Sequence, residues 1–258
     1  MCEKRYYHYC DYKKFKDIIE KDVLYLVDPR IQNDDKEMRY FCDVLIPKVD
    51  AELGECFAYK YFVNEYSNND PHLFIKCLSG DCKDEKMWNE YASNGTGVAL
   101  KIDVDSLIKD NQGLEMCKIK YVEDCIDEEN KENIKEFLYD LKKKSDYIPN
   151  IIDEILLKSL EYKSSYWSKE NETRLIYRVN GSFELNRVGS FDSSNKIQYF
   201  TLKNIKKYIT QVIVGPNCMY NKDIIKKCLV DIGYSPNIDV INYEDIKLSK
   251  LSDKLKYN

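Results

Sequence analysis

The segment Tyr166–Val179, which reads YWSKENETRLIYRV, places two carboxylates and a guanidinium at alternate positions. If the segment is a β-strand, alternation puts Glu170, Glu172 and Arg174 on one face and mostly apolar residues on the other. A carboxylate held in place by a cation stays ionised and can stabilise positive charge that develops during bond cleavage. We therefore predict Glu170, Glu172 and Arg174 as catalytic residues.

Two simpler interpretations of the same residues stay open. In a helix, Glu170 and Arg174 would form an i,i+4 ion pair worth about 0.3–0.5 kcal/mol. In a strand, Glu172 and Arg174 could pair across a pocket wall and keep the sheet soluble. Both interpretations are structural and involve no chemistry.

Composition limits the class of protein. The chain has 258 residues, 43% of them hydrophobic, which is enough for a large core. It has no apolar run of about 18 residues and no apolar signal segment at its start, so we expect a cytoplasmic protein that does not enter a membrane. Ten cysteines without a C-x-x-C pair indicate reduced thiols, and with two histidines no metal site is predicted from them. The net charge of −5 argues against a general electrostatic grip on nucleic acid.

The apolar pattern predicts both strands and helices. Strands are predicted at residues 5–9, 23–27, 73–78, 98–102, 116–122, 174–179, 182–185, 196–200, 209–214 and 238–242, and those at 98–102 and 116–122 are expected to pair. Helices are predicted at 12–21, at 36–66 with a break near Pro47, around Met87–Tyr91, at 128–163 with a break at Pro149, and at 221–232. We therefore predict an α+β fold: one domain over residues 1–245, with a central mixed or antiparallel sheet flanked by helices and a helical insertion, and a Lys-rich tail at 246–258.

Several short motifs follow one another along the chain. They are Asn33-Asp34 with Glu37, Cys77-Leu78-Ser79, Met87-Trp88-x-x-Tyr91, Gly97–Asp103, Lys163-x-x-x-Trp167-x-x-Glu170-x-Glu172-x-Arg174, and Ile213-Val214-Gly215-Pro216. In this order, from residue 6 to about 216, the chain resembles the bacterial DUF2971 family. One departure is Asn33-Asp34-Asp35, where the family pattern is similar to Asn-Asp-Pro, although a tight turn is still expected there.

The resemblance implies a residue set and not a reaction, because the family name records unknown function. It implies cytosolic bacterial proteins, some suspected of roles in phage defence or as toxins. We expect the motif residues to converge on one pocket that suits a nucleotide-like small molecule. The predicted binding residues are His8, Asn33, Asp34, Ser79, Trp88, Tyr91 and Trp167.

The spacing Glu170-x-Glu172 resembles the E-x-E loop of mono-ADP-ribosyltransferases. In those enzymes one carboxylate holds a ribose hydroxyl and stabilises the oxocarbenium ion, while the other orients the acceptor. The start Arg5–Tyr9, followed by a helix and a strand, resembles the start of that fold and would place His8 or Arg5 near the nicotinamide-side ribose or the pyrophosphate. We therefore expect an ADP-ribosyltransferase-like enzyme that uses NAD as a substrate, needs no metal and acts on a macromolecular acceptor.

Two other classes stay open. A metal-dependent nuclease would hold Mg²⁺ with Asp34, Glu37, Glu170 and Glu172, although no P-D-(x)n-E-x-K string is present. A non-catalytic nucleotide-sensing module would bind its ligand in the same pocket. No oligomeric state is predicted.

Overall fold

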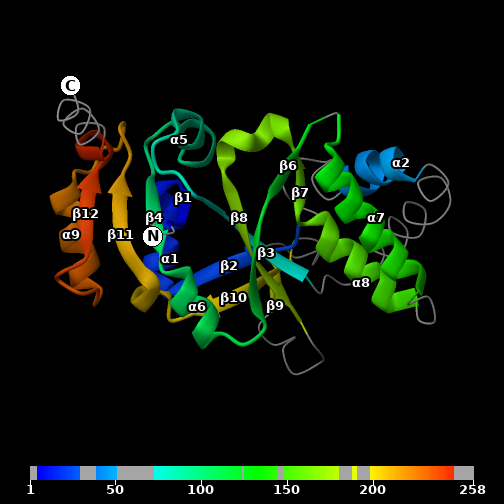
Figure 1. The fold of residues 1–258 in the computed structure, drawn as a ribbon. Helices are drawn as coiled ribbons and strands as arrows, with labels where there is room; N and C mark the ends of the chain where they lie inside the picture. The colour runs from blue at the N-terminus through cyan, green and yellow to red at the C-terminus, as the bar shows by residue number, and fades with distance from the viewer. Residues whose placement is uncertain are drawn as a thin grey trace.

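The architecture is a large β-sheet with helices around it. The computed structural model describes residues 5–29, 39–50, 73–123, 125–143, 148–179, 188–190 and 198–246. Within these ranges the strands form one ten-stranded sheet and one two-stranded sheet (Figure 1). The predicted α+β fold with a central sheet flanked by helices is confirmed.

The ten-stranded sheet has the order β12-β11-β4-β1-β3-β2-β10-β9, with β8 added beside β3 and β5 beside β8. Its pairs are antiparallel except β11 with β12, and the separate pair β6 and β7 is also parallel. The strands are β1 (Tyr7–Cys10), β2 (Val23–Val27), β3 (Leu73–Ser79), β4 (Val98–Ile102), β5 (Leu114–Lys118), β6 (Lys120–Val122), β7 (Tyr162–Ser164), β8 (Glu172–Arg178), β9 (Val188–Ser190), β10 (Gln198–Lys203), β11 (Ile209–Val214) and β12 (Asp239–Asn242).

The helices begin where the sequence offers caps. Asp11, Asp84, Asp103 and Asn221 each accept a hydrogen bond from a backbone N–H in the first turn of the helix that follows. The helical elements are α1 (Tyr12–Lys21), the π-helix η2 (Phe41–Leu45), α2 (Ile46–Val49), α5 (Glu85–Tyr91), α6 (Val104–Asp110), α7 (Glu128–Lys143), α8 (Ile148–Ser159), the 3₁₀ helices η3 (Ser165–Glu170) and η5 (Ile205–Tyr208), and α9 (Lys222–Asp231). Among the described helices, none has the length and apolar character needed to span a membrane.

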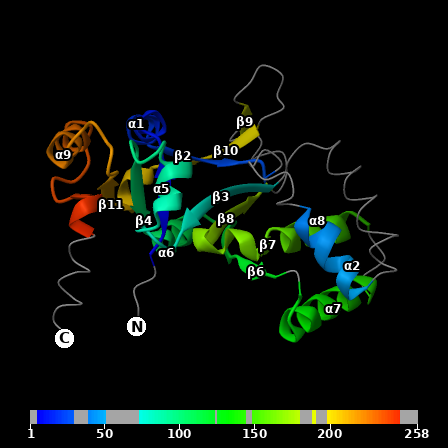
Figure 2. The same cartoon turned by 90° about the horizontal axis from the view of Figure 1, so that it is seen from above.

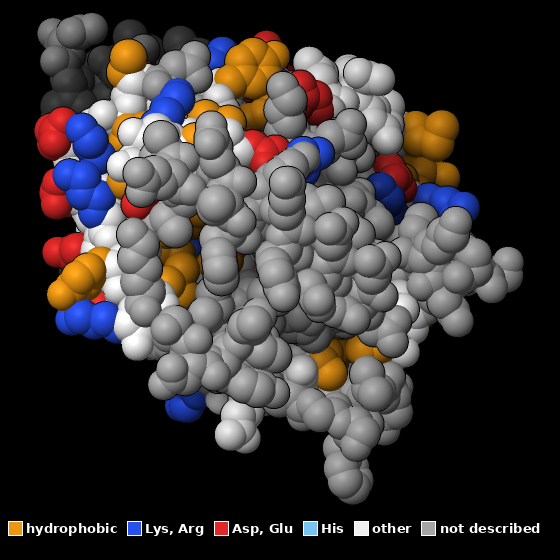
Figure 3. Space-filling model, turned by 90° about the vertical axis from the view of Figure 1, so that its right-hand side faces the viewer, with side chains coloured by type: hydrophobic (Ala, Val, Ile, Leu, Met, Phe, Trp, Pro, Cys, Tyr) orange, Lys and Arg blue, Asp and Glu red, His pale blue; other side chains and the backbone are white. Residues whose placement is uncertain are grey.

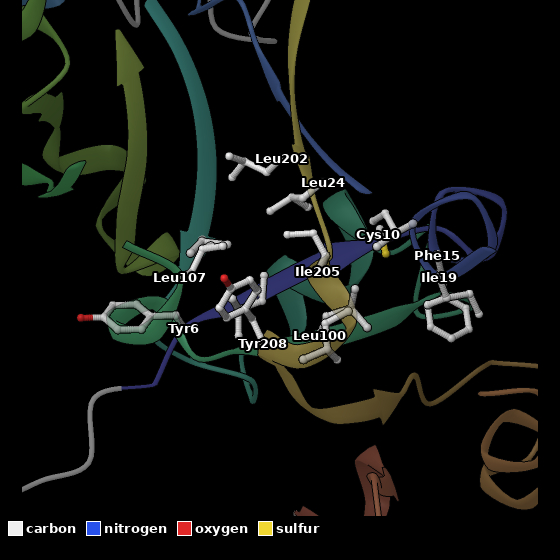
Figure 4. Close-up of a cluster of buried hydrophobic side chains, with 14 of the residues drawn as sticks. Tyr6, Cys10, Phe15, Ile19, Leu24, Leu100, Leu107, Leu202, Ile205 and Tyr208 are labelled. Atoms are coloured by element: carbon white, nitrogen blue, oxygen red, sulfur yellow. The ribbon is translucent and has the colours of Figure 1, made fainter. Parts of the chain in front are cut away.

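Three clusters of buried side chains hold the layers together. The largest packs α1, α6 and α9 against the sheet, and Figure 4 shows Phe15, Cys10 and Leu100 from three of its elements. A second cluster joins α2, α7 and α8 at one end of the molecule, where the predicted helical insertion lies (Figure 2). A third cluster packs α5 against β1 and β4. The sheet is therefore covered by different helices on its two faces.

Two strands, β1 and β2, share one edge of β3 and separate from each other along it. Strand β8 pairs with β3 over its whole length, so β1 and β2 share the opposite edge. Strand β2 pairs there through Val27 with Ile75, and β1 through Tyr7 with Ser79. Between these two contacts no described strand pairs with that edge of β3. Figure 1 shows β2 and β10 running nearly across the direction of β4 and β11, which opens a gap at this point.

Close backbone contacts fix the connection from α5 to β4. The N–H of Gly215 donates to the carbonyl of Gly97 at 3.0 Å. A Cβ added to Gly97 would lie 2.1 Å from the carbonyl oxygen of Cys10, and one added to Gly215 would lie 2.2 Å from that of Gly95. Only glycine allows backbones to approach this closely, so these residues lock the end of β11 to the start of β4.

Two predicted features of the sheet are wrong. The strands at 98–102 and 116–122 do not pair: β4 lies between β1 and β11, whereas β5 pairs with β8. The reason is that β8 is buried along almost its whole length and requires a partner at each edge. The predicted strand at 116–122 is in fact two strands, β5 and β6, in different sheets.

One predicted feature of the helices holds and another differs. The π-helix η2 ends at Leu45 and α2 begins at Ile46, so a change of helix does lie near Pro47, which occupies the first turn of α2. The helical prediction at 128–163 extends too far, since α8 ends at Ser159 and Lys163 lies on β7. Pro149 does mark the start of a new helix. The predicted strand at 182–185, the helical prediction beyond residue 50 and the tail from 247 lie outside the described residues.

Candidate functional site

A cavity of about 470 Å³ lies beside the gap between β1 and β2. Its size falls in the range of about 300–1,000 Å³ that is typical of small-molecule pockets. Its described lining comes from β1, α1, β2, β3, α5, β7, η3 and the first residue of β8. Segments far apart in sequence therefore meet at one place, as the motif residues predicted.

Two carboxylates and two cations form a buried ion network at one side of this cavity. The ammonium of Lys163 donates to Glu170 Oε2 at 2.6 Å and to Glu172 Oε2 at 3.1 Å. Arg174 donates from Nε to Glu172 Oε1 at 2.7 Å and from Nη1 to the carbonyl of Leu160 at 3.0 Å. The four residues are at most 5% exposed and their formal charges sum to zero.

A local turn brings the two glutamates to the same cation. Glu170 is the last residue of η3, Asn171 has a left-handed backbone with φ of 43°, and Glu172 begins β8. Asn tolerates this conformation better than most residues. Ser79 Oγ donates a hydrogen bond to the carbonyl oxygen of Glu170 at 2.8 Å. The N–H of Gly80 donates to the carbonyl oxygen of Asn171, also at 2.8 Å. The end of β3 therefore holds the turn in place.

The prediction that Glu170, Glu172 and Arg174 share one face of a single strand is thus wrong for Glu170. It reaches the network from a 3₁₀ helix and not from the strand. The prediction holds for Glu172 and Arg174, which are two residues apart on β8 and in contact. The turn at Asn171, not alternation, makes the carboxylates neighbours.

The network fixes the protonation state of Glu172. Burial alone would raise the pKa of this carboxyl, but the charges of Arg174 and Lys163, with hydrogen bonds from Arg174 and Cys77, lower the pKa to about 2. Glu172 is therefore an anion at neutral pH. Tyr91 donates from its hydroxyl to Glu170 Oε1 at 2.7 Å. Burial and this bond raise the pKa of Tyr91 well above its usual value, so the phenol stays protonated.

Across the cavity, His8 and Lys76 provide a different environment. Burial, followed by the charges of Lys76 and Lys14, lowers the pKa of His8 well below 6.5, so the imidazole is neutral at pH 7. Burial likewise lowers the pKa of Lys76 to about 8. The imidazole can donate one hydrogen bond and accept another, which suits a hydroxyl group.

The structure brings together most of the predicted site residues. Those that line the cavity are His8, Ser79, Tyr91, Trp167, Glu170 and Glu172. Asn33 and Asp34 lie outside the described residues. Arg174 is fully buried behind Glu172 and does not line the cavity, so we reassign it from a catalytic to a positioning residue.

The two tryptophans have different surroundings. Trp88 is 1% exposed, donates from Nε1 to the carbonyl of Cys82 at 3.0 Å and packs between Tyr9 and Tyr243. It is not among the described residues that line the cavity, and its contacts are those of a packed core residue. Trp167 is half-buried and lines the cavity, with the ammonium of Lys163 5.1 Å from its ring centre.

Sequence reasoning missed part of the lining. Lys76, Lys14, Tyr7 and Tyr25 also face the cavity. Only Lys76 carries a signal that could have found it, since it is a charged residue within the otherwise apolar strand LFIKCLS. The others follow from the divergence of β1 and β2, which is a tertiary feature.

The described charged residues of the ion network are held in ion pairs. The described part of the chain holds no group of three or more His, Cys, Asp or Glu side chains placed to bind a metal ion. The ammonium of Lys163 occupies the position between the two carboxylates where a cation would sit. On the face shown in Figure 3, described Lys, Arg, Asp and Glu side chains are intermixed, without a large area of one sign.

Comparison with known proteins agrees with the motifs. Residues 87–175 match the model of a family described as a protein of unknown function, DUF2971. We call this stretch, which is similar to DUF2971, the DUF2971 region. The DUF2971 region supplies Tyr91, Trp167 and the whole buried ion network, whereas His8 and β3 precede it. No curated protein and no solved structure matches the chain.

Proposed function

We propose that the cavity binds NAD⁺ and that the protein is an ADP-ribosyltransferase-like enzyme. The observation that carries the proposal is the position of Glu172. It is an ionised carboxylate, fixed by Arg174 and Lys163, in the lining of a cavity that also contains the neutral His8 and the ring of Trp167. This combination of groups suits a ligand with an aromatic base and ribose hydroxyls.

The chemistry requires a fixed negative charge. When ADP-ribose is transferred, the bond between ribose C1′ and the nicotinamide nitrogen breaks, and its electron pair leaves with nicotinamide. Positive charge develops on C1′ and the ring oxygen, where Glu172 would stabilise it without reorientation because its position is already set. The nucleophile of the acceptor then bonds to C1′, and its proton passes to a base such as Glu170.

The side chains around Glu172 have complementary tasks. Arg174 and Lys163 keep it ionised within a buried site. His8 would bind a ribose hydroxyl through its one donor and one acceptor. Trp167, half-buried at the cavity, offers a ring surface for a base.

The nuclease alternative fits the geometry less well. A divalent cation bound by Glu170 and Glu172 would have to displace Lys163, which already bonds both carboxylates. A binding module is the second candidate, because both oxygens of Glu172 already accept hydrogen bonds from Arg174 and Lys163. In that case the network would shape the pocket and catalyse nothing.

The test is release of nicotinamide from NAD⁺ by the purified protein in the presence of EDTA. We expect release by the parent protein, loss of release in Glu172→Gln, and no loss in Glu115→Gln, which changes an exposed carboxylate on β5. Binding to the folded state alone stabilises it by about 2.7 kcal/mol at a ligand concentration a hundred times Kd, so a thermal shift with NAD⁺ measures binding separately.

Trp167→Ala keeps the test decisive if Glu172→Gln folds poorly. The substitution removes no charge and no hydrogen bond from the ion network, although the Trp167 ring lies beside Lys163, so we expect the variant to fold and to lose most of the NAD⁺ thermal shift. A shift without nicotinamide release would support the binding module. No shift with NAD⁺ would contradict the proposal.

A further inference from the structure

Lys76 is an unusual residue of the cavity that the proposed reaction does not use. It lies in the middle of β3, half-buried, in the stretch where neither β1 nor β2 pairs with that strand. None of the ion pairs among the described residues includes it. Lysine is rarely buried without a counter-charge, because desolvation of the ammonium costs free energy. Because no described carboxylate pairs with Lys76, a bound anion is a candidate for its counter-charge.

The groups around Lys76 carry little negative charge. Cys10 and Cys77 are the nearest titratable neighbours on the strands, and burial raises the pKa of Cys10 to about 12, so its thiol is neutral. Lys14 faces the same space from α1 and adds a second positive charge. His8 on β1 is neutral and Tyr25 lines the cavity from β2.

The carboxylates of the cavity are engaged elsewhere. Asp17 on α1 pairs with Lys21 at 3.0 Å, and Glu90 on α5 pairs with Lys86 at 3.7 Å. Glu170 and Glu172 both bond Lys163. Among the described residues, the space near Lys76 therefore carries an excess of positive charge, although the chain as a whole has a net charge of −5.

The positive groups and the ion network occupy opposite faces of the sheet. On β1 the side chains of Tyr7 and Tyr9 belong to the cluster beneath α5, while Cys10 belongs to the cluster beneath α1. Alternation puts His8 on the same face as Cys10. On β3, alternation puts Lys76 on the face opposite to Ser79, whose hydroxyl donates a hydrogen bond to the backbone of Glu170. The cavity thus joins a positive region on one face to the buried ion network on the other.

We propose that Lys76, together with Lys14, forms an anion subsite that binds the phosphate groups of the cavity's ligand. This subsite rests on the proposed function only in assigning those phosphates to NAD⁺, whose pyrophosphate lies between two riboses. A ribose at Glu172 would leave the pyrophosphate to extend through the gap toward Lys76. The ligand class that fits both ends is a nucleotide with a diphosphate group.

The subsite couples binding to a proton. A bound diphosphate stabilises the ammonium form of Lys76, so the ligand binds best when that amine is protonated. Because the pKa of Lys76 is about 8 before the ligand binds, the affinity is nearly constant below pH 7 and falls above pH 8. Between pH 7 and pH 9 the affinity for the ligand should fall about tenfold, as expected when binding requires one group to be protonated.

The experiment is calorimetric titration with ADP-ribose, whose diphosphate does not change charge over this pH range, and with adenosine as the uncharged probe. We expect the parent protein to lose about tenfold in ADP-ribose affinity from pH 7 to pH 9, and its adenosine affinity to stay constant. Lys76→Met should weaken ADP-ribose binding at pH 7 and remove the pH dependence. Lys76→Arg should keep the affinity and make it independent of pH, since a guanidinium does not titrate.

Lys16→Met is the control, because Lys16 is an exposed lysine of α1 that pairs with Glu20 and does not line the cavity. It should bind ADP-ribose like the parent. Three results would overturn the anion subsite. They are equal ADP-ribose affinity in the parent and in Lys76→Met, an unchanged dependence of the affinity on pH in Lys76→Arg, and no binding of ADP-ribose at all. Binding that depends on Lys76, without any nicotinamide release from NAD⁺, would uphold the subsite and reject the transferase.

Discussion

Replacing Arg174 with methionine removes one charge from the buried ion network and keeps a long unbranched side chain. Arg174 is 0% exposed and Glu172 is 3% exposed. After the substitution both glutamates would share Lys163 alone, so one buried negative charge would have no counter-charge. Breaking a buried ion pair in this way costs about 3–5 kcal/mol, and we expect the free energy of unfolding at pH 7 to fall by about that amount.

The same network sets the pH range of the effect. The pKa of Glu172 is lowered from 4.5 to about 2, so its ion pair contributes stability that is fully present above pH 4.5 and is lost as the pH falls toward 2. In Arg174→Met the pKa of Glu172 rises, because the guanidinium charge that contributes most to lowering it is gone. The difference in stability between parent and variant should therefore shrink as the pH is lowered from 5 to 3.

Urea denaturation at pH 7, 5, 4 and 3 measures both effects, with Arg39→Met as the matched control. Arg39 pairs with Asp43 at 2.9 Å, but their side chains are 44% and 29% exposed, and loss of such a pair costs about 1 kcal/mol or less. The double variant Glu172→Gln with Arg174→Met leaves only the pair of Lys163 and Glu170, so its cost should be less than the sum of the single costs. Two results would refute the reasoning. One is a loss of stability in Arg174→Met as small as that in Arg39→Met, and the other is a cost of the double variant equal to the sum of the two single costs.

Three further substitutions test other parts of the site. Tyr91→Phe removes the hydroxyl that bonds Glu170, and should lower the free energy of unfolding by about 1.5–3 kcal/mol in urea denaturation at pH 7, because the lost bond is to a charged group. His8 has a pKa well below 6.5 in the folded protein, so below pH 6.5 the unfolded chain binds a proton at this residue that the folded protein does not. The stability of the parent should therefore fall as the pH drops below 6.5. Thermal unfolding followed from pH 8 to 5 should show a smaller fall in His8→Gln. Gly215→Ala would place a Cβ 2.2 Å from the carbonyl oxygen of Gly95, so we expect a large drop in the melting temperature; an unchanged value would contradict the close backbone contact.

Local patterns predicted the elements whose signals lie within a few residues. Helix α1 begins and ends at the predicted residues, because Asp11 caps it and Phe15, Ile18 and Ile19 form one apolar face. Strands β2 and β11 also have the predicted bounds, since each is a short apolar run between turn residues. These features need no knowledge of distant partners.

The strand pairing and the exact site could not be read in the same way. The pairing of β8 with β3 joins residues about a hundred positions apart, and a periodic pattern does not state which strands are partners. Glu170 reaches Lys163 because one residue, Asn171, adopts a left-handed backbone, and alternation could not anticipate that. The cavity depends on where β1 and β2 separate, so the role of Lys76 became visible only with the fold.

The topology has a consequence for the boundary of the DUF2971 region. That region contains β4 and the first part of β8. The partners of β4 are β1 and β11, and one of the two partners of β8 is β3, and all three of these strands lie outside residues 87–175. An isolated fragment with these limits would carry the entire ion network yet expose strand edges on either side of it, and exposed edges invite association with other chains. We therefore expect the matched segment to be a unit of sequence similarity and not a unit of folding, and we expect a fragment that folds by itself to extend from β1 to at least the end of β11.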